Sequence, residues 1–255
     1  MSVKIETFVD GYAILGDSTT REVLDCIKSL VDPVGLIVCD PPYGNVLKTR
    51  WDRTGKTQEQ YAAWMLDWTH MWAEILTEGG AFYVWGGIGT KGFRPFMRYL
   101  SDIESHGQLN IANLITWSKK RGYGVQNNYL FTREECVYLV KGNPKAPRIF
   151  NVPFQDKLRG YAGYNKKYPA HDARLRRTNV WTDITEIFRN KTHPAQKTQR
   201  LLEIPIEVHT NPGEYVIDPF AGSGATAFAA RALGRKFIVI ENDESSFNEI
   251  VRKLT

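Results

Sequence analysis

The sequence VIDPFAGSGATAFAARALGRKFIVIE, residues 216–241, has the layout of a β–α–β unit built around a ligand. An apolar strand ends at Asp218, a turn with Gly222 and Gly224 follows, and after a helical stretch a second apolar strand ends at Glu241. Glycines permit positive φ and a close approach of a ligand, while an acid after the second strand can accept hydrogen bonds from ribose hydroxyls. The stretch therefore predicts two parallel strands with a nucleotide-like ligand at their carboxyl ends.

This turn departs from the dinucleotide fingerprint in its glycines and in its acid. It lacks the third glycine of GxGxxG and the Lys-Ser/Thr pair of a phosphate-binding loop. Asp218 would also repel a pyrophosphate. S-adenosylmethionine fits better, because it carries an ammonium, a sulfonium and a ribose but no phosphate. The alternative interpretation is a tight strand–helix turn without a ligand.

A second strand end with specific chemistry lies in LIVCDPPYGN, residues 36–45. Its four apolar residues predict a strand buried on both faces. The two prolines then end any ladder, because neither has an N–H and both fix φ. Asp40 is thereby held at the carboxyl end of a strand, on a stiff turn with Tyr43 close behind. An ordinary turn would need less specific chemistry than this.

Short apolar segments alternate with helical patterns over most of the chain, which predicts an α/β fold with a doubly wound, largely parallel sheet. Besides the unit at 216–241, strands are predicted over residues 12–17, 35–40, 79–87, 109–119 and 134–142, and helices over 20–30, 57–76, 92–104, 195–210 and 244–254. Trp64, Trp68 and Trp72 recur at helical spacing, and we interpret them as core side chains rather than a binding surface.

The composition is that of an ordinary globular protein. The 255 residues suffice for one large α/β domain, with 42% hydrophobic and 24% charged residues. No run approaches the roughly 18 apolar residues of a membrane span, and the first residues lack the apolar core of a signal peptide. Three cysteines in no CxxC pattern predict reduced thiols, and the five histidines show no metal-ligand spacing. We therefore expect a cytoplasmic protein without a metal or a membrane partner.

Positive charge is concentrated in one part of the chain. Residues 141–200 contain fourteen Lys and Arg against four acids, a net +10 within a chain of net +5. From about residue 142 to 192 the strand–helix alternation also stops, and Pro, Gly and Tyr are frequent. A basic insert with aromatic residues is typical of nucleic-acid binding. A solvated loop region is the alternative interpretation.

The motifs DPPY, residues 40–43, and DPFAGSGAT, residues 218–226, together resemble the amino-group DNA methyltransferases that use S-adenosylmethionine. Their order resembles the permuted β class of that family. LTEGGAFYV (76–84) and the stretch 114–142 are similar to further family segments, and HPAQKTQRL (193–201) is similar to the HPxQKP element, with Thr198 where proline is usual. The resemblance covers most of the chain and thins in 145–190.

The resemblance implies a class I methyltransferase fold, which is a Rossmann-like, doubly wound, seven-stranded and mostly parallel sheet. Residues 1–141 would form the catalytic part of the domain, 142–192 an inserted target-recognition region, and 193–255 the cofactor-binding part. Circular permutation would make the N-terminal strand 12–17 the neighbour of the last strand. The two termini should then lie close together.

The resemblance also implies the roles of individual residues. Asp40 and the Pro41 carbonyl would accept hydrogen bonds from an exocyclic amine of a flipped-out base, on a turn fixed by Pro42, and Tyr43 would stack on that base. The cofactor-binding residues implied are Asp17, Asp40, Lys197, Asp218, Pro219, Phe220, Ala221, Gly222, Ser223, Gly224, Glu241 and Asn242. His193 matches the same element as Lys197. A plain strand-ending Asp is the alternative for Asp17, and a solvated Lys for Lys197.

Further residues are candidates for contact with the target. Phe131 or Tyr129 could supply a second aromatic beside the base, with core packing as an equal alternative, and Trp51 lies in a polar loop that could close over it. The DNA-contacting candidates are Lys157, Arg159, Lys166, Lys167, Arg174, Arg176 and Arg177, interleaved with Tyr161, Tyr164 and Tyr168.

Together these features predict a site-specific adenine-N6 methyltransferase of double-stranded DNA. The closest alternative is a cytosine-N4 methyltransferase, since the family tends to use SPPY for cytosine and DPPY for adenine. RNA is another possible substrate, and a non-catalytic nucleic-acid-binding subunit is an alternative of a different class. By analogy we also expect a homodimer, a cognate restriction endonuclease, and a bacterial, phage or plasmid origin.

Overall fold

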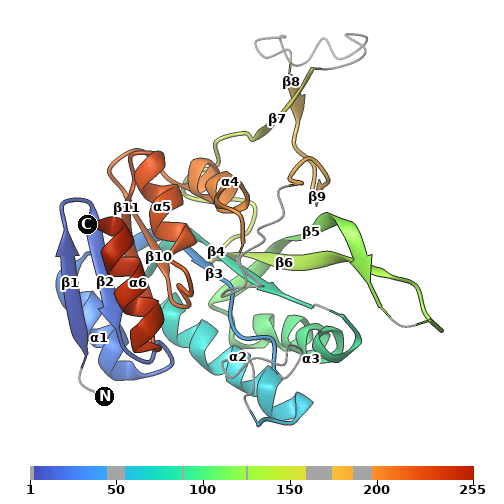
Figure 1. The fold of residues 1–255 in the computed structure, drawn as a ribbon, viewed down its shortest axis with the longest axis horizontal. Helices are drawn as coiled ribbons and strands as arrows, with labels where there is room; N and C mark the ends of the chain where they lie inside the picture. The colour runs from blue at the N-terminus through green and yellow to red at the C-terminus, as the bar shows by residue number, and fades with distance from the viewer. Residues whose placement is uncertain (1–2, 45–54, 88, 125, 159–173, 186–196) are drawn as a thin grey trace.

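The computed structural model describes residues 3–44, 55–87, 89–124, 126–158, 174–185 and 197–255, and its centre is one mixed sheet (Figure 1). The strands run in the order β1-β2-β11-β10-β3-β4-β6-β5-β9, and most neighbouring pairs are parallel. Their bounds are β1 Lys4–Phe8, β2 Gly11–Leu15, β3 Val34–Cys39, β4 Leu76–Gly86, β5 Leu109–Tyr123, β6 Phe131–Lys141, β9 Val180–Trp181, β10 Tyr215–Asp218 and β11 Lys236–Glu241.

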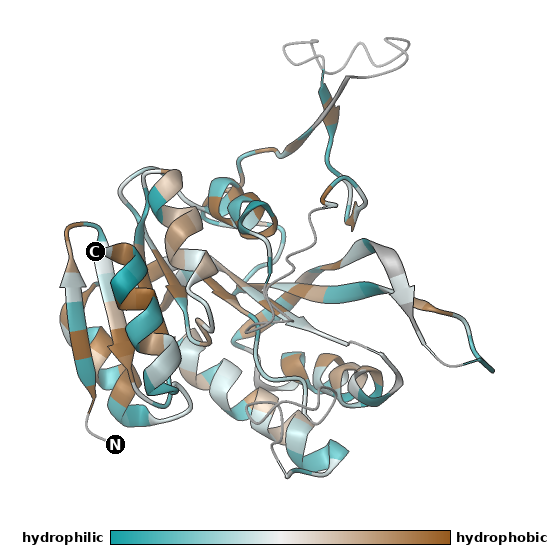
Figure 2. Cartoon of the chain, in the orientation of Figure 1, coloured by the Kyte–Doolittle hydropathy of each residue, from teal (hydrophilic) through white to brown (hydrophobic). Residues whose placement is uncertain are grey.

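Helices cover both faces of this sheet, because successive side chains of a strand point to opposite sides. Leu36 and Val38 of β3 belong to one apolar core, and Ile37 and Cys39 belong to the other. The helices that pack on the first core are α4 (Gln199–His209), α5 (Ala225–Ala232) and α6 (Glu244–Leu254). Those that pack on the second core are α1 (Arg21–Leu30), α2 (Gln58–Ala73) and α3 (Gly89–Asp102). Helix α3 continues into the short 3-10 helix Ile103–His106. Figure 2 shows the apolar residues concentrated on the central strands and on the inner sides of the helices. The predicted doubly wound α/β fold is confirmed.

The N-terminal strand occupies the predicted place in the sheet. β2 pairs with β11 in parallel, with Ile14 beside Ile240. The first described strand also lies against the last helix, because the Lys4 ammonium lies 5.3 Å from the centre of the Phe247 ring on α6. β1 was not predicted: it pairs antiparallel with β2 at the edge of the sheet, and its residues are mostly exposed. β1 and β9 extend the described sheet to nine strands instead of the predicted seven.

The tryptophan-rich helix is anchored at its start by polar contacts and along its length by the core. Thr57 and Gln60 form a reciprocal capping box, which satisfies two N–H groups at the first turn of α2. Trp68 and Trp72 are 1% and 0% exposed, so their assignment to the core is confirmed. Trp64 is only partly buried and lines a pocket described below.

Two extensions project from the body (Figure 1). Gly86, the last residue of β4, pairs with Glu135, so the β5–β6 hairpin continues beyond the sheet on the side of the carboxyl ends of the parallel strands. The insert contributes a separate antiparallel ribbon of β7 (Phe154–Leu158) and β8 (Arg174–Arg176). Among the described residues no helix is long and apolar enough to cross a bilayer. The division at residues 142 and 192 stays a prediction.

Candidate active site

A pocket of about 930 Å³ opens at the carboxyl ends of β2, β3, β10 and β11. Parallel neighbours end at the same edge of a sheet, so residues far apart in the sequence meet there. The pocket is lined by Asp17, Ser18, Thr19, Val38, Cys39, Asp40, Pro41, Pro42, Tyr43, Lys56, Trp64, Lys197, Leu202, Asp218, Pro219, Phe220, Ala221, Gly222, Ser223, Ala225, Thr226, Ile240, Glu241, Asn242, Asp243, Glu244 and Ser246. The two motifs quoted above therefore share one cavity.

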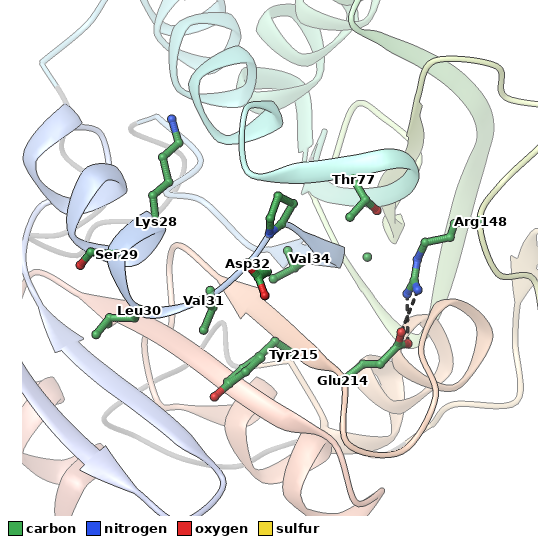
Figure 3. Close-up of a pocket in the computed structure, with 12 residues that line it drawn as sticks. Lys28, Ser29, Leu30, Val31, Asp32, Val34, Thr77, Arg148, Glu214 and Tyr215 are labelled. Carbon is green, nitrogen blue, oxygen red and sulfur yellow. Dashed lines mark hydrogen bonds and ion pairs between the residues drawn. The ribbon is translucent and has the colours of Figure 1, made fainter.

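A smaller hollow of about 480 Å³ lies at the opposite, amino ends of β3 and β10 (Figure 3). Its two cationic side chains are already paired with acids of the protein. Arg148 donates two hydrogen bonds to Glu214, at 2.7 and 3.0 Å, and Lys28 donates to Glu74 at 2.7 Å. The candidate active site is therefore the larger pocket, where buried acids face the cavity.

The glycine turn has the conformation that its sequence predicts. Gly222 and Gly224 have φ of 54° and 80°, a region that favours glycine. The Gly222 N–H donates to the Glu241 carboxylate at 2.8 Å, and the Phe220 N–H and the Thr226 hydroxyl donate to Asp218 at 2.9 and 2.5 Å. These bonds fix both acids in place at neighbouring strand ends.

Burial perturbs both acids. Burial raises the pKa of Asp218 to about 7, against the effect of the hydrogen bonds from Thr226 and Phe220 and with a contribution from Asp40 and Glu241. Burial likewise raises the pKa of Glu241, although this carboxylate accepts backbone N–H bonds. Among the described residues, hydrogen bonds to these two acids come only from neutral donors. A cationic ligand would therefore be stabilised here, because it favours the ionised carboxylates.

A third strand end brings Asp17 to the same pocket. The Gly16 N–H donates to the carbonyl of Glu241 at 2.9 Å, which places the end of β2 beside the end of β11. The Asp17 carboxylate is exposed and accepts from the N–H and the hydroxyl of Thr19, at 2.9 and 2.7 Å. The local turn therefore orients Asp17 toward the rim of the pocket, and its role in cofactor binding stays a prediction.

The DPPY turn is rigid and buried. The Tyr43 hydroxyl donates to Asp40 at 2.5 Å, and the Tyr61 hydroxyl of α2 donates to the carbonyl of Pro42 at 2.5 Å. Tyr43 is 3% exposed and Pro41 is also buried. Burial raises the pKa of Asp40, opposed chiefly by the charge of Lys197. The carboxylate is thus held at one position facing the pocket.

Lys197 reaches this turn from the residues just before α4. Its ammonium donates to Asp40 at 2.8 Å and to the Tyr43 hydroxyl at 2.6 Å, and it forms an ion pair with Glu134 at 2.9 Å. Glu134, from β6, is also paired with Lys119. Sequence reasoning missed Glu134, because an acid in the strand pattern TREECVYLV gives no signal of a buried partner.

Other pocket residues missed by sequence reasoning come from the segments after the acids. Ser18 and Thr19 follow Asp17, and Asp243 begins α6 by accepting from the Ser246 N–H at 2.9 Å. Asp is a favoured residue at the start of a helix, so the N-cap position of Asp243 could have been predicted from the sequence. Trp64 packs against the core, as predicted, and also lines the pocket beside Phe220, with their rings 6.0 Å apart.

Several predicted target-side residues lie away from this arrangement. Tyr129 is 92% exposed at the hairpin, so core packing is excluded for it, while Phe131 is partly buried. Arg174 and Arg176 are exposed on β8. Arg177 differs: its side chain is 6% exposed and donates two hydrogen bonds to Asp183, so it stabilises the insert itself.

Some predictions fall outside what the structure describes. Trp51, Arg159, Lys166, Lys167, His193 and the three insert tyrosines lie outside the described residues, as does the side chain of Lys157. Within the described part of the chain no cluster of three or more His, Cys, Asp or Glu could hold a metal ion.

The site can be compared with known proteins at this point. Among curated proteins, the type II methyltransferase M.BamHI of Bacillus amyloliquefaciens is 29% identical over 245 residues, which is 90% of this chain and 55% of that protein. The chain thus spans little more than half of that relative.

Two solved structures share the fold. The crystal structure of the M1.HpyAVI–SAM complex matches with a TM-score of 0.63 and 24% identity, over 95% of this chain and 98% of that one. The PvuII DNA methyltransferase, described as cytosine-N4-specific, matches with a TM-score of 0.71 and 18% identity, over 96% and 86%. The family model described as DNA methylase, which covers N6 and N4 methyltransferases, matches residues 34–252. The chain therefore belongs to the N6/N4 amino-group DNA methylase family.

Proposed function

We propose that the protein transfers a methyl group from S-adenosylmethionine to the N6 amine of a flipped-out adenine in double-stranded DNA. The observation that carries the proposal is the position of Asp40, on a rigid turn that faces the same pocket as Asp218 and Glu241. The order of these two motifs along the chain supports assignment to the permuted β class.

The pocket fits the proposed cofactor. Its volume of about 930 Å³ is within the range of small-molecule sites. Asp218 would attract the cationic part of the cofactor, and Glu241 would accept hydrogen bonds from ribose hydroxyls with lone pairs that its backbone donors leave available. Trp64 and Phe220 supply apolar surface beside them. When bound, S-adenosylmethionine supplies a methyl group that its sulfonium already activates.

The protein itself then contributes position and electrostatics. An exocyclic amine is a poor nucleophile because its lone pair is delocalised into the ring. Asp40 and the Pro41 carbonyl would accept the two amine hydrogens, which favours a pyramidal nitrogen with its lone pair free. Tyr43 would contact the face of the base. Because the amine cannot be reached inside a duplex, the base must leave the stack.

Adenine is preferred to cytosine on the motif alone. DPPY stands at residues 40–43, and the resembling family tends to use this form for adenine. The fold does not separate the two, since the cytosine-N4-specific PvuII enzyme has the same one. Transfer of labelled methyl groups to DNA, followed by nucleoside analysis, tests the choice: N6-methyladenine supports the proposal and N4-methylcytosine replaces it.

DNA binding would use the basic insert. Arg174 and Arg176 present exposed guanidinium groups on the projecting β7–β8 ribbon, where they can reach phosphates (Figure 1). The likeness to the type II enzyme M.BamHI supports a role beside a restriction endonuclease in a bacterial cell. We further propose a homodimer, which sedimentation of the purified protein with and without DNA would test.

A further inference from the structure

We propose that Lys197 is a positioning residue that keeps Asp40 ionised and oriented toward the target amine, and that it does not bind the cofactor. This inference rests on the proposed methyl transfer and assigns a role that differs from the one the sequence suggested for this lysine. Lys197 is 4% exposed, which is exceptional for a lysine.

The contacts of the Lys197 ammonium show what this side chain binds. A protonated lysine has three N–H donors and no acceptor. Three oxygen atoms lie within 2.9 Å of Lys197 Nζ, from Asp40, Tyr43 and Glu134. Two of these contacts are hydrogen bonds, to Asp40 and Tyr43, and the third is an ion pair with Glu134, so oxygen atoms of the protein surround the ammonium. Lys197 therefore stabilises the DPPY turn.

The lysine is also fixed from the sides. Its Nζ lies 5.2 Å from the centre of the Trp85 ring, so an aromatic ring adjoins the cation. Its neighbour Thr198 begins α4 by accepting from the Leu201 N–H at 3.4 Å, which fixes the backbone at this point. Glu134 is 4% exposed and is held by Lys119 as well.

The charged groups around Asp40 determine whether its carboxyl group is ionised. Its titratable neighbours are Cys39 and Tyr43 from β3 and its turn, Cys136 and Glu134 from β6, Asp218 from β10, and Lys197. Lys197 is the only cation in this set, which is drawn from the described residues. Burial alone would lower the pKa of Lys197, but the charges of Asp40 and Glu134 raise it, so the lysine stays protonated. Without it, burial and the neighbouring acids would favour a protonated Asp40.

Ionisation of Asp40 matters for the reaction. A carboxylate oxygen has two lone pairs, so each oxygen of Asp40 can accept from the protein and still accept from the amine. Tyr43 uses one lone pair of Oδ1, and Lys197 uses one of Oδ2. A protonated Asp40 would present a donor in place of an acceptor. Methyl transfer should therefore fall as pH falls through the pKa of Asp40.

The test is the pH profile of single-turnover methyl transfer to DNA with saturating S-adenosylmethionine. In Lys197→Met the acidic limb of this profile, where the rate falls with falling pH, should move to higher pH by about one unit or more. This is the pKa change expected for a carboxyl group that loses an opposite charge. Lys197→Arg should restore the limb toward that of the wild type. Lys253→Met, in an exposed ion pair with Glu249 on α6, is the matched control and should leave the limb in place.

A second variant guards against misfolding. Lys197→Gln keeps a hydrogen-bond donor beside Asp40 without the charge, and the acidic limb should again move upward. Calorimetry should show that both variants bind S-adenosylmethionine within about threefold of the wild type. An unshifted limb in a folded variant would overturn the inference, and so would a tenfold loss of cofactor affinity. Absence of transfer by the wild type would refute the proposed function instead, so the two failures are distinguishable.

Discussion

Replacement of Asp218 by Asn is expected to stabilise the cofactor-free protein above pH 7 and to weaken cofactor binding. Asp218 is 5% exposed, and burial raises its pKa from the ordinary 3.8 to about 7. Because the folded-state pKa is the higher one, the folded protein binds more protons than the unfolded chain between these two values. The stability contributed by the neutral acid is full below pH 3.8 and is lost as pH rises to 7.

The magnitude follows from that difference in pKa. About three units correspond to about 4 kcal/mol at 1.36 kcal/mol per unit. The asparagine amide fits the existing contacts, because its oxygen can accept from the Phe220 N–H and its nitrogen can donate to the Thr226 hydroxyl. Asp218→Asn should therefore gain about 2–4 kcal/mol of unfolding free energy at pH 8 and little at pH 4.

Urea denaturation of the cofactor-free protein between pH 4 and pH 8 measures this gain. Asp67→Asn, at an exposed position of α2, is the control and should show no pH-dependent gain. S-adenosylmethionine binding at pH 8 should weaken by about 10- to 100-fold in Asp218→Asn, the size of a hydrogen bond to a charged group. Parallel stability curves for wild type and variant across this pH range would refute the reasoning.

Three further outcomes are expected. Burial lowers the pKa of His209 from 6.5 to about 4, so the free energy of unfolding should fall by about 3 kcal/mol as pH falls from 6.5 to 4. His209→Phe should remove that loss, as measured by urea denaturation. Trp72→Ala should cost about 3–5 kcal/mol of unfolding free energy, because the side chain is fully buried in the core between sheet and helix. Arg174→Ala and Arg176→Ala should each reduce the slope of log affinity for DNA against log salt by about one, whereas equal slopes in filter binding would exclude phosphate contacts by these residues.

The positions of the pocket acids were predictable because these residues stand at strand ends. Asp40, Asp218 and Glu241 each follow an apolar run, and parallel pairing alone brings such positions to one edge. These inferences needed only a local pattern and the topology of a doubly wound sheet. The place of the N-terminal strand beside β11 came instead from the circular permutation that the family resemblance implies.

The remaining contacts were not predictable, because they depend on tertiary packing. Lys197 and Asp40 are 157 residues apart, and neither Lys197 nor Glu134 lies in a pattern that marks a buried charge. Arg177 looked like its exposed neighbours in the basic insert, yet its partner Asp183 lies six residues on, in irregular chain. β1 escaped prediction because the segment KIETF is short and partly charged, and its strand character comes from pairing with β2.

The site sorts its charges into two groups. The Lys197 ammonium donates hydrogen bonds to Asp40 and Tyr43 and forms an ion pair with Glu134. Those two acids are held by neutral donors and keep raised pKa values. Asp40, the proposed catalytic acid, is thus paired with a cation of the protein, whereas Asp218 and Glu241, the proposed cofactor-binding acids, are left for a cation that comes from outside. A second lysine placed against Asp218 would stabilise the empty pocket, but it would also remove the electrostatic reason for a sulfonium compound to bind there.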